Sequence, residues 1–232
     1  MLYDVLTNFI VSPLDASQLG FLTEDFKVVA TARTPSSATE LNALAASTNG
    51  RVEVLPLDID DEASADAFVA ALTEKYGKVD FVIYNAGVSG TFSTPKAVSK
   101  TDLVNTFTTN AFAPISLTDK MLPLLKASKD PRAVYVSTMM SSLALVNNSV
   151  MPSYRASKVA LNMLVRTLAQ DVPEVAFMLV HPGWVKTAMG GENAPVLPDD
   201  SAAGILATAA KFCTKEHSAD ALYTFEGTTM PW

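Results

Sequence analysis

Short runs of apolar, largely β-branched residues alternate along the chain with longer segments whose apolar residues recur at helical spacing. The short runs predict strands at 2–7, 27–32, 51–57, 79–84, 133–138, 175–181 and 222–225, and most are apolar throughout, as in parallel strands covered on both faces. The longer segments predict helices at 36–47, 61–76, 100–126, 152–171 and 199–212. Strict alternation of strand and helix predicts an α/β fold, a doubly wound parallel sheet with helices on both faces.

Composition narrows the class of protein. The 232 residues are 49% hydrophobic and 18% charged, against a usual charged share of about 25%, which suits one domain over 1–232 with a large core. The net charge of −7 argues against nucleic-acid and anionic-membrane partners. Cys213 is the only cysteine, so an internal disulfide is excluded, and with two histidines no metal site is expected. With neither a targeting segment nor a membrane-length apolar run, a soluble cytoplasmic protein is expected.

Two long loops follow predicted strands. They cover 139–151 and 183–198 and begin at the carboxyl ends of strands, where ligands bind in such sheets. Their large side chains Met139, Met140, Trp184 and Met189 are candidates for contact with an apolar or aromatic substrate. The alternative is that these residues pack over the sheet edge.

One pair of side chains points to acid–base chemistry. Tyr154 and Lys158 are four residues apart on a predicted helix, so both lie on one face. A buried ammonium beside a phenol lowers the phenol pKa from its usual value of about 10, which makes the tyrosine a workable acid or base. By itself the pair fits a solvated helix face better, because the Tyr-x-x-x-Lys pattern often arises by chance.

The surrounding motifs resemble one family. A strand ends in Asn85-Ala86-Gly87, Asn110 lies on the next helix, a strand ends at Thr138, and the chain from His181 to Thr187 follows the pair. In this order, from about residue 27 to the end, the motifs resemble the short-chain dehydrogenase/reductase family, and in particular its sniffer-like and C-factor-like carbonyl-reductase branch. The resemblance implies a Rossmann-like fold and carbonyl reduction.

The resemblance implies catalytic roles for several residues. Tyr154 would protonate the carbonyl oxygen, or take the alcohol proton in reverse, and Lys158 would lower its pKa and hold the nicotinamide ribose. Asn110 would bend its helix and join a water-mediated proton relay. A hydroxyl after the fifth strand would bond the substrate oxygen. Thr138 is favoured for this role by its position, and Ser141, thirteen residues before Tyr154, is the rival.

The resemblance also implies a dinucleotide cofactor. Arg33 follows the second strand where no acid stands, which favours a ribose 2′-phosphate and therefore NADPH, although a solvated arginine is the alternative. The other positions that match cofactor contacts are Asp58 and Ile59 for adenine, Asn85, Ala86 and Gly87 for the adenine ribose, and Pro182, Gly183, Val185 and Thr187 with Lys158 for the nicotinamide end.

The sequence departs from the family at its phosphate loop. The family has Thr-Gly-x-x-x-Gly-x-Gly after the first strand, whereas an ungapped count places Asn8, Ser12 and Leu14 at the three glycines. Pro13 has no N–H to offer a phosphate, so dinucleotide affinity is expected to be weakened. A wrong register or an altered gene start are alternatives, but Gly20 is the only glycine before residue 50, so no shift of register restores the motif.

Three functions therefore remain open. The first is an NADPH-dependent carbonyl reductase, a homodimer or homotetramer that pairs through the helices near 102–125 and 152–168. The second is a cofactor-independent enzyme on the same fold that uses Tyr154 and Lys158 for isomerisation, cyclisation or elimination. The third is a non-catalytic pseudo-reductase.

Overall fold

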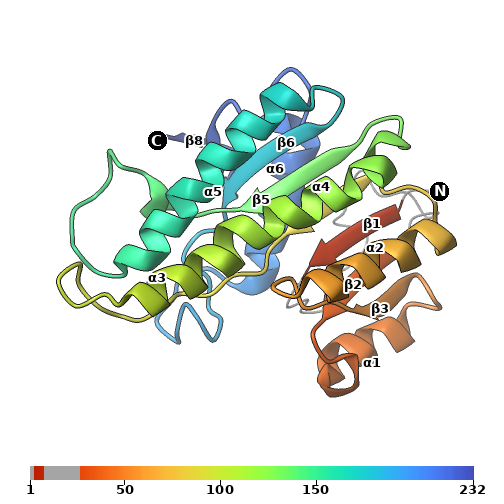
Figure 1. The fold of residues 1–232 in the computed structure, drawn as a ribbon, viewed down its shortest axis with the longest axis horizontal. Coiled ribbons are helices and arrows are strands. Elements are labelled where there is room, and N and C mark those ends of the chain that lie inside the picture. The colour runs from red at the N-terminus through yellow and green to blue at the C-terminus, as the bar shows by residue number, and fades with distance from the viewer. Residues whose placement is uncertain (1–2, 8–26) are drawn as a thin grey trace.

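The chain forms one eight-stranded sheet between layers of helices (Figure 1). A computed structural model describes residues 3–7 and 27–232. The strand order is β3-β2-β1-β4-β5-β6-β7-β8; all neighbours are parallel except β7 and β8. The strands are β1 (Tyr3–Thr7), β2 (Lys27–Ala32), β3 (Val52–Pro56), β4 (Phe81–Tyr84), β5 (Arg132–Val136), β6 (Ala176–His181), β7 (Leu222–Thr224) and β8 (Thr229–Met230).

Local sequence signals set where the helices begin. Asp61 caps α2 by accepting a hydrogen bond from the Ala63 N–H, and Ser99 caps α3 in the same way from Asp102. Pro152 and Pro198 occupy the first turns of α5 and α6, where a missing N–H costs nothing. The helices are α1 (Thr39–Ser47), α2 (Glu62–Lys75), α3 (Lys100–Phe107), α4 (Ala113–Lys126), α5 (Pro152–Asp171) and α6 (Pro198–Phe212), with short turns η2 (Pro35–Ser37), η3 (Thr108–Phe112) and η4 (Met139–Ser141).

The sheet separates two hydrophobic clusters. On one face α2, α4 and α5 contribute side chains such as Leu72, Met121 and Val165, all fully buried. On the other face α6 packs Ile205 and Ala209 against the sheet. Figure 1 shows α2, α4 and α5 in front of the sheet and α6 behind it. The predicted doubly wound parallel sheet is confirmed, because helices cover both faces of the sheet. Successive residues of a strand point to opposite faces and pack into the two different clusters.

The predicted helix over 100–126 is wrong in one detail. Residues 108–112 form a π-helical turn, η3, between α3 and α4. Such single wide turns are frequent at functional sites. The sequence does not predict strand β8, because a strand of two residues is too short to show an alternation of apolar and polar side chains. The predicted strand at 2–7 is present from Tyr3, and residue 2 lies outside the described part.

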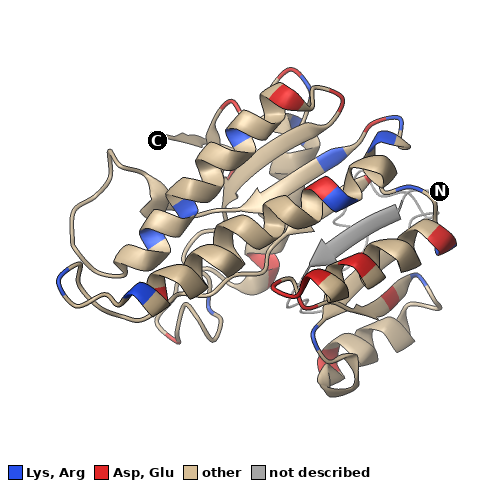
Figure 2. Ribbon diagram, in the orientation of Figure 1, with Lys and Arg blue, Asp and Glu red and all other residues tan. Residues whose placement is uncertain are grey.

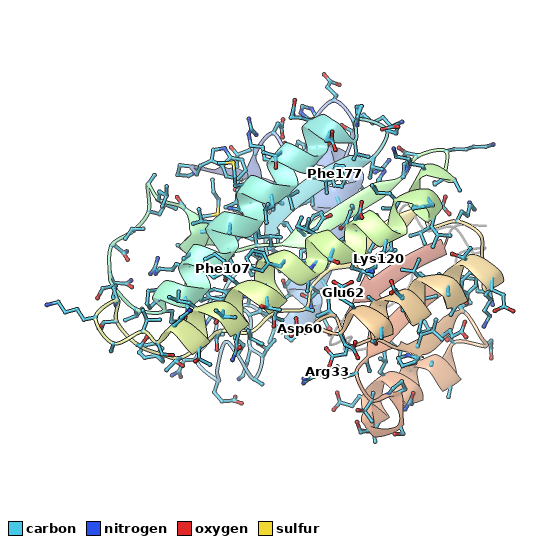
Figure 3. The ribbon with its side chains drawn as sticks, viewed as in Figure 1. Arg33, Asp60, Glu62, Phe107, Lys120 and Phe177 are labelled. Carbon is cyan, nitrogen blue, oxygen red and sulfur yellow. The ribbon has the colours of Figure 1, made fainter. Side chains whose placement is uncertain are left out.

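Charges of both signs are interspersed on the helices (Figure 2). Lys120 of α4 lies 2.9 Å from Glu62 and 2.6 Å from Asp66, both on α2, and Figure 3 labels Lys120 and Glu62.

Within residues 3–7 and 27–232, no helix has the length and apolar character needed to cross a bilayer. The same residues contain no group of three or more His, Cys, Asp or Glu side chains placed to hold a metal ion.

Candidate functional site

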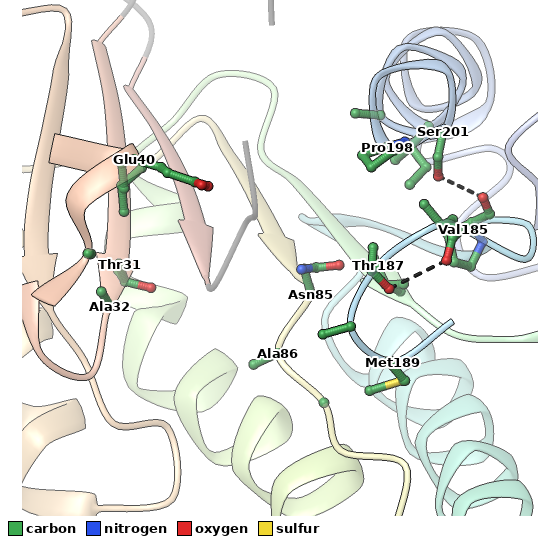
Figure 4. Close-up of a pocket in the computed structure, with 18 of the residues that line it drawn as sticks. Thr31, Ala32, Glu40, Asn85, Ala86, Val185, Thr187, Met189, Pro198 and Ser201 are labelled. Atoms are coloured by element: carbon green, nitrogen blue, oxygen red, sulfur yellow. Dashed lines mark hydrogen bonds between the residues drawn. The ribbon is translucent and has the colours of Figure 1, made fainter. Parts of the chain in front are cut away.

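A cavity of about 630 Å³ opens at the carboxyl ends of the parallel strands (Figure 4). Its wall includes Thr31 and Ala32 from the end of β2, residues 85–87 after β4, and Val136 and Ser137 at the end of β5. Pro182 after β6 and the first turns of α6 close the other side. The cavity therefore spans the point where the strand order reverses, between β1 and β4, which is where open α/β sheets bind ligands.

Helix α5 places Tyr154 and Lys158 together in the cavity wall. Lys158 is 4% exposed, and its Nζ donates a 2.7 Å hydrogen bond to the carbonyl oxygen of Val136. Burial disfavours the ammonium form and lowers the Lys158 pKa to about 8. The ammonium has three N–H donors, one of which is directed at the sheet.

The pKa of Tyr154 moves in the opposite direction to that predicted. Burial raises the phenol pKa, and a hydrogen bond with the Thr138 side chain offsets part of the rise. The prediction that the neighbouring ammonium lowers this pKa is wrong for the chain by itself, because the Lys158 ammonium is directed at the Val136 carbonyl and desolvation dominates. The phenol is therefore protonated at neutral pH and is poised as an acid.

The two rival hydroxyls after β5 have different environments. The Thr138 side chain bonds with Tyr154 and accepts from the Met140 N–H at 3.2 Å. The Ser141 hydroxyl donates to the Thr138 carbonyl at 2.6 Å and accepts from Asn162 Nδ2 at 2.8 Å. Ser141 is 3% exposed and Thr138 is 6% exposed, and neither residue is in the cavity wall. The geometry therefore favours Thr138 as the hydroxyl beside Tyr154.

Asn110 lies in the π-helical turn η3 and clamps the chain after β4. Its Oδ1 accepts from the Val88 N–H at 2.8 Å, and its Nδ2 donates to the Val88 carbonyl at 2.8 Å and to Ser157 Oγ at 3.0 Å. A Cβ on Gly87 would lie 3.1 Å from Asn110 Oδ1 and 3.7 Å from Lys158 Nζ. A side chain at this position would therefore be tight against Asn110 and in ordinary contact with Lys158.

The structure gathers most of the predicted cofactor positions. Those that line the cavity are Asn85, Ala86, Gly87, Lys158, Pro182, Val185 and Thr187. Four others lie outside its wall: Arg33, Asp58, Ile59 and Gly183. Arg33 is exposed beyond β2 (Figure 3), and Gly183, with a positive φ of 87°, packs against Phe225 and Val196. Asp58 Oδ1 accepts from the Asp60 N–H at 3.1 Å, and Ile59 packs against the core.

Of the four predicted substrate residues, one lies in the cavity wall and three lie outside it. Met189 lines the cavity. Met139 and Trp184 are 44% and 56% exposed outside its wall, and Trp184 Nε1 donates to the Gly190 carbonyl at 2.8 Å. Met140 is half-buried. Contact of these side chains with a substrate stays a prediction.

Sequence reasoning missed two parts of the wall. The first follows β2 and includes Ser37, Thr39 and Glu40, whose side chain extends toward the cavity in Figure 4. The second is Ser201 of α6, which is 4% exposed and donates to the Pro182 carbonyl at 2.6 Å. A signal was present for the first group, because residues just after a parallel strand face this edge. Ser201 had none, since its place depends on how α6 packs.

The segment that replaces the family's glycine-rich loop lies outside the described residues. The structure does show that β1 ends at Thr7, paired in register with Thr31 of β2 and Tyr84 of β4. Asn8, Ser12, Pro13 and Leu14 therefore follow this strand in the sequence, as the ungapped count assumed. The expected helix start at Ser12 and the weakened phosphate site stay predictions.

Comparison with known proteins agrees with this arrangement. The family model for short chain dehydrogenases matches residues 16–196. C-signal of Myxococcus xanthus is 40% identical over 158 residues, which cover 67% of this chain and 94% of that protein.

Solved structures show the same fold. The NADPH-bound carbonyl reductase from chicken fatty liver superposes with a TM-score of 0.89 at 30% identity, over 100% of this chain and 99% of that one. The carbonyl reductase Sniffer of D. melanogaster gives 0.88 at 27% identity over 100% of both chains. With the Tyr154–Lys158 pair in the wall of the cavity and a family match over most of the chain, the protein belongs to the short-chain dehydrogenase family.

Proposed function

We propose that the protein reduces a carbonyl group of a small apolar or aromatic substrate with NADPH. One observation carries the proposal. Tyr154 and Lys158 lie together in the wall of the cavity where the strand order reverses, and the Thr138 side chain makes a hydrogen bond with the Tyr154 phenol. The carbonyl reductases among the similar structures, one of them solved with NADPH, support the same reaction class.

Each residue would have a distinct role. The Tyr154 hydroxyl donates its proton to the carbonyl oxygen, and the Thr138 hydroxyl bonds that oxygen and holds it in line. With the cofactor bound, Lys158 would hold the nicotinamide ribose, and its positive charge would then favour the phenolate that remains. Asn110 holds the backbone of residues 87–88 in place by two hydrogen bonds to Val88. It thereby fixes the part of the cavity wall that lies next to Lys158. The cofactor, when bound, supplies the hydride.

The described residues fit a dinucleotide in this cavity. The cavity extends from the end of β2, past residues 85–87, to residues 182–189 beside α6. Residues 85–87 would lie along the ribose at the adenine side, and Lys158 with Val185 and Thr187 would hold the nicotinamide end. The apolar Met189 in the wall suits an apolar substrate next to that end.

The proposal is tested with Tyr154→Phe, which removes only the hydroxyl. NADPH oxidation is followed with a panel of aldehydes, ketones and quinones, and NADPH affinity is measured by calorimetry. We expect kcat to fall by at least about 100-fold, because the acid is lost, with little change in NADPH affinity. Equal rates in both proteins, or no turnover of any carbonyl by the unchanged protein, would contradict the proposal.

The lack of glycine at positions 8, 12 and 14 favours a second candidate, a cofactor-independent proton-transfer enzyme. Its discriminating property is turnover without NADPH that is lost in Tyr154→Phe. Calorimetry separates the two candidates, since the second requires no NADPH binding at millimolar cofactor. Absence of both binding and turnover would instead identify a non-catalytic protein.

We also propose that the protein pairs through the faces of η3 and α5. Phe112 and Met163 are 54% and 62% exposed on these two elements, and Val104 of α3 is 52% exposed. A contiguous exposed apolar patch marks an interaction site, and these three side chains would form part of one. Sedimentation should give a dimer or tetramer, and Met163→Glu should shift it towards the monomer.

A further inference from the structure

The face of α5 that holds the proposed acid continues one turn further along the helix. Asn162 follows Tyr154 and Lys158 at the same four-residue spacing, so all three side chains share one face. Asn162 is 5% exposed. A buried amide is retained in such a place only where its donors and acceptor are satisfied.

The Asn162 amide is satisfied by two serines that flank Thr138. Its Oδ1 accepts from Ser137 Oγ at 2.6 Å, and its Nδ2 donates to Ser141 Oγ at 2.8 Å. Ser137 and Ser141 are 1% and 3% exposed, so water does not compete for these bonds. The Asn162 amide therefore connects α5 to both ends of the turn between β5 and η4, at Ser137 and at Ser141.

The chain of hydrogen bonds ends on Thr138. Ser141 Oγ donates to the Thr138 carbonyl at 2.6 Å, and the Ser141 N–H donates to the same oxygen at 3.1 Å. Thr138 in turn bonds Tyr154 through its side chain. The path runs from α5 through Asn162, Ser141 and Thr138, and returns to α5 at Tyr154.

We propose that Asn162 is a positioning residue of the active site, which sets the distance between the Thr138 hydroxyl and Tyr154 by holding the 137–141 turn against α5. This inference rests on the proposed carbonyl reduction. Two hydroxyls that polarise one carbonyl oxygen must stay aligned to within a fraction of an ångström, and a misplaced group costs large factors in rate. The network also occupies the hydroxyls of Ser137 and Ser141, which leaves Thr138 to meet the substrate.

The test uses Asn162→Leu, which keeps the volume of the side chain and removes its polar atoms. Menadione is reduced by the full chain with NADPH, and kcat, KM and NADPH affinity are measured. We expect kcat to fall about 10- to 100-fold, with NADPH affinity unchanged within about twofold. Val165→Ala is the matched control, because Val165 is equally buried on α5 and has no part in the network, and it should keep kcat.

A double-mutant cycle shows whether Asn162 acts through Thr138. In a Thr138→Val background the hydroxyl to be positioned is already gone, so Asn162→Leu should lower kcat by no more than about threefold. Ser141→Ala breaks the same path without altering α5 and should show the same dependence on Thr138, so it decides the question if Asn162→Leu does not fold. Equal losses with and without Thr138, or an equal loss in Val165→Ala, would overturn the inference while leaving the reductase proposal intact. A wild-type protein that reduces no carbonyl would overturn the proposed function, and this inference with it.

Discussion

Replacing Lys158 with methionine should make the protein more stable at neutral pH, although it removes a residue of the proposed site. The side chain is 4% exposed, and burial lowers its pKa from 10.5 to about 8. A lowered pKa means that the folded state holds the proton less tightly than the unfolded chain does. At pH 7 both states are protonated, so the full cost of burying the ammonium is present.

The magnitude follows from the two pKa values. The difference between 10.5 and about 8, at about 1.4 kcal/mol per pH unit, makes the buried charge cost about 3 kcal/mol at pH 7. The cost declines as the pH rises through the folded pKa, to about 1 kcal/mol at pH 10, and vanishes above the unfolded pKa. Loss of the bond to the Val136 carbonyl should cost about 1 kcal/mol at every pH, so Lys158→Met should gain about 2 kcal/mol at pH 7.

The assay is urea unfolding of both proteins between pH 6.5 and 10. Other titrating groups cancel in the difference, so the advantage of Lys158→Met should shrink by about 2 kcal/mol from pH 7 to pH 10. Lys96→Met, at an exposed lysine, is the control and should follow the wild-type protein throughout. A difference between Lys158→Met and wild type that stays constant with pH would refute the reasoning, whatever its size.

Two further predictions concern the loop after β4 and the cofactor. Gly90→Ala should destabilise the protein by about 2 kcal/mol or more, because φ is +65° and the new Cβ would lie 2.7 Å from Ser153 Oγ. Gly191→Ala, with φ of +80° and open space around it, should lose only about 1 kcal/mol, and equal losses on urea unfolding would contradict the steric argument. Arg33→Ala should weaken NADPH binding about 10-fold and leave NADH binding unchanged, because only NADPH carries the 2′-phosphate. Calorimetry with both dinucleotides checks this, and an equal loss for the two would remove Arg33 from the cofactor site.

The strands and helices could be predicted from the sequence because the sheet is buried on both faces. Strands such as β6 must then be apolar throughout, and α5 must show an apolar face at helical spacing, so both patterns are visible without the structure. The observed bounds of α5 and the predicted 152–171 are the same. The π-helical turn η3 was not visible, because one extra residue in a helical turn leaves the apolar spacing on either side almost unchanged.

The candidate site was predictable as a set of residue types and only partly as an arrangement. Spacing on one helix placed Tyr154 and Lys158 on the same face, since a helix fixes that relation locally. The position directly after the fifth strand favours Thr138 over Ser141 as the hydroxyl beside the tyrosine, but the spacing of thirteen residues before Tyr154 keeps Ser141 as a rival. The structure favours Thr138, since the Ser141 hydroxyl is held by Asn162.

By itself the sequence determined the alternation of strand and helix, the Tyr154–Lys158 pair and the lack of glycine at positions 8, 12 and 14, because each is a property of neighbouring residues. Only the tertiary structure decided the direction of the Tyr154 pKa, the entry of Ser201 into the cavity wall, and the link from Asn162 to Thr138. Those properties depend on burial and on contacts between segments far apart in the chain. Desolvation and hydrogen bonding act over a few ångströms in space, and sequence spacing does not set such distances between separate elements.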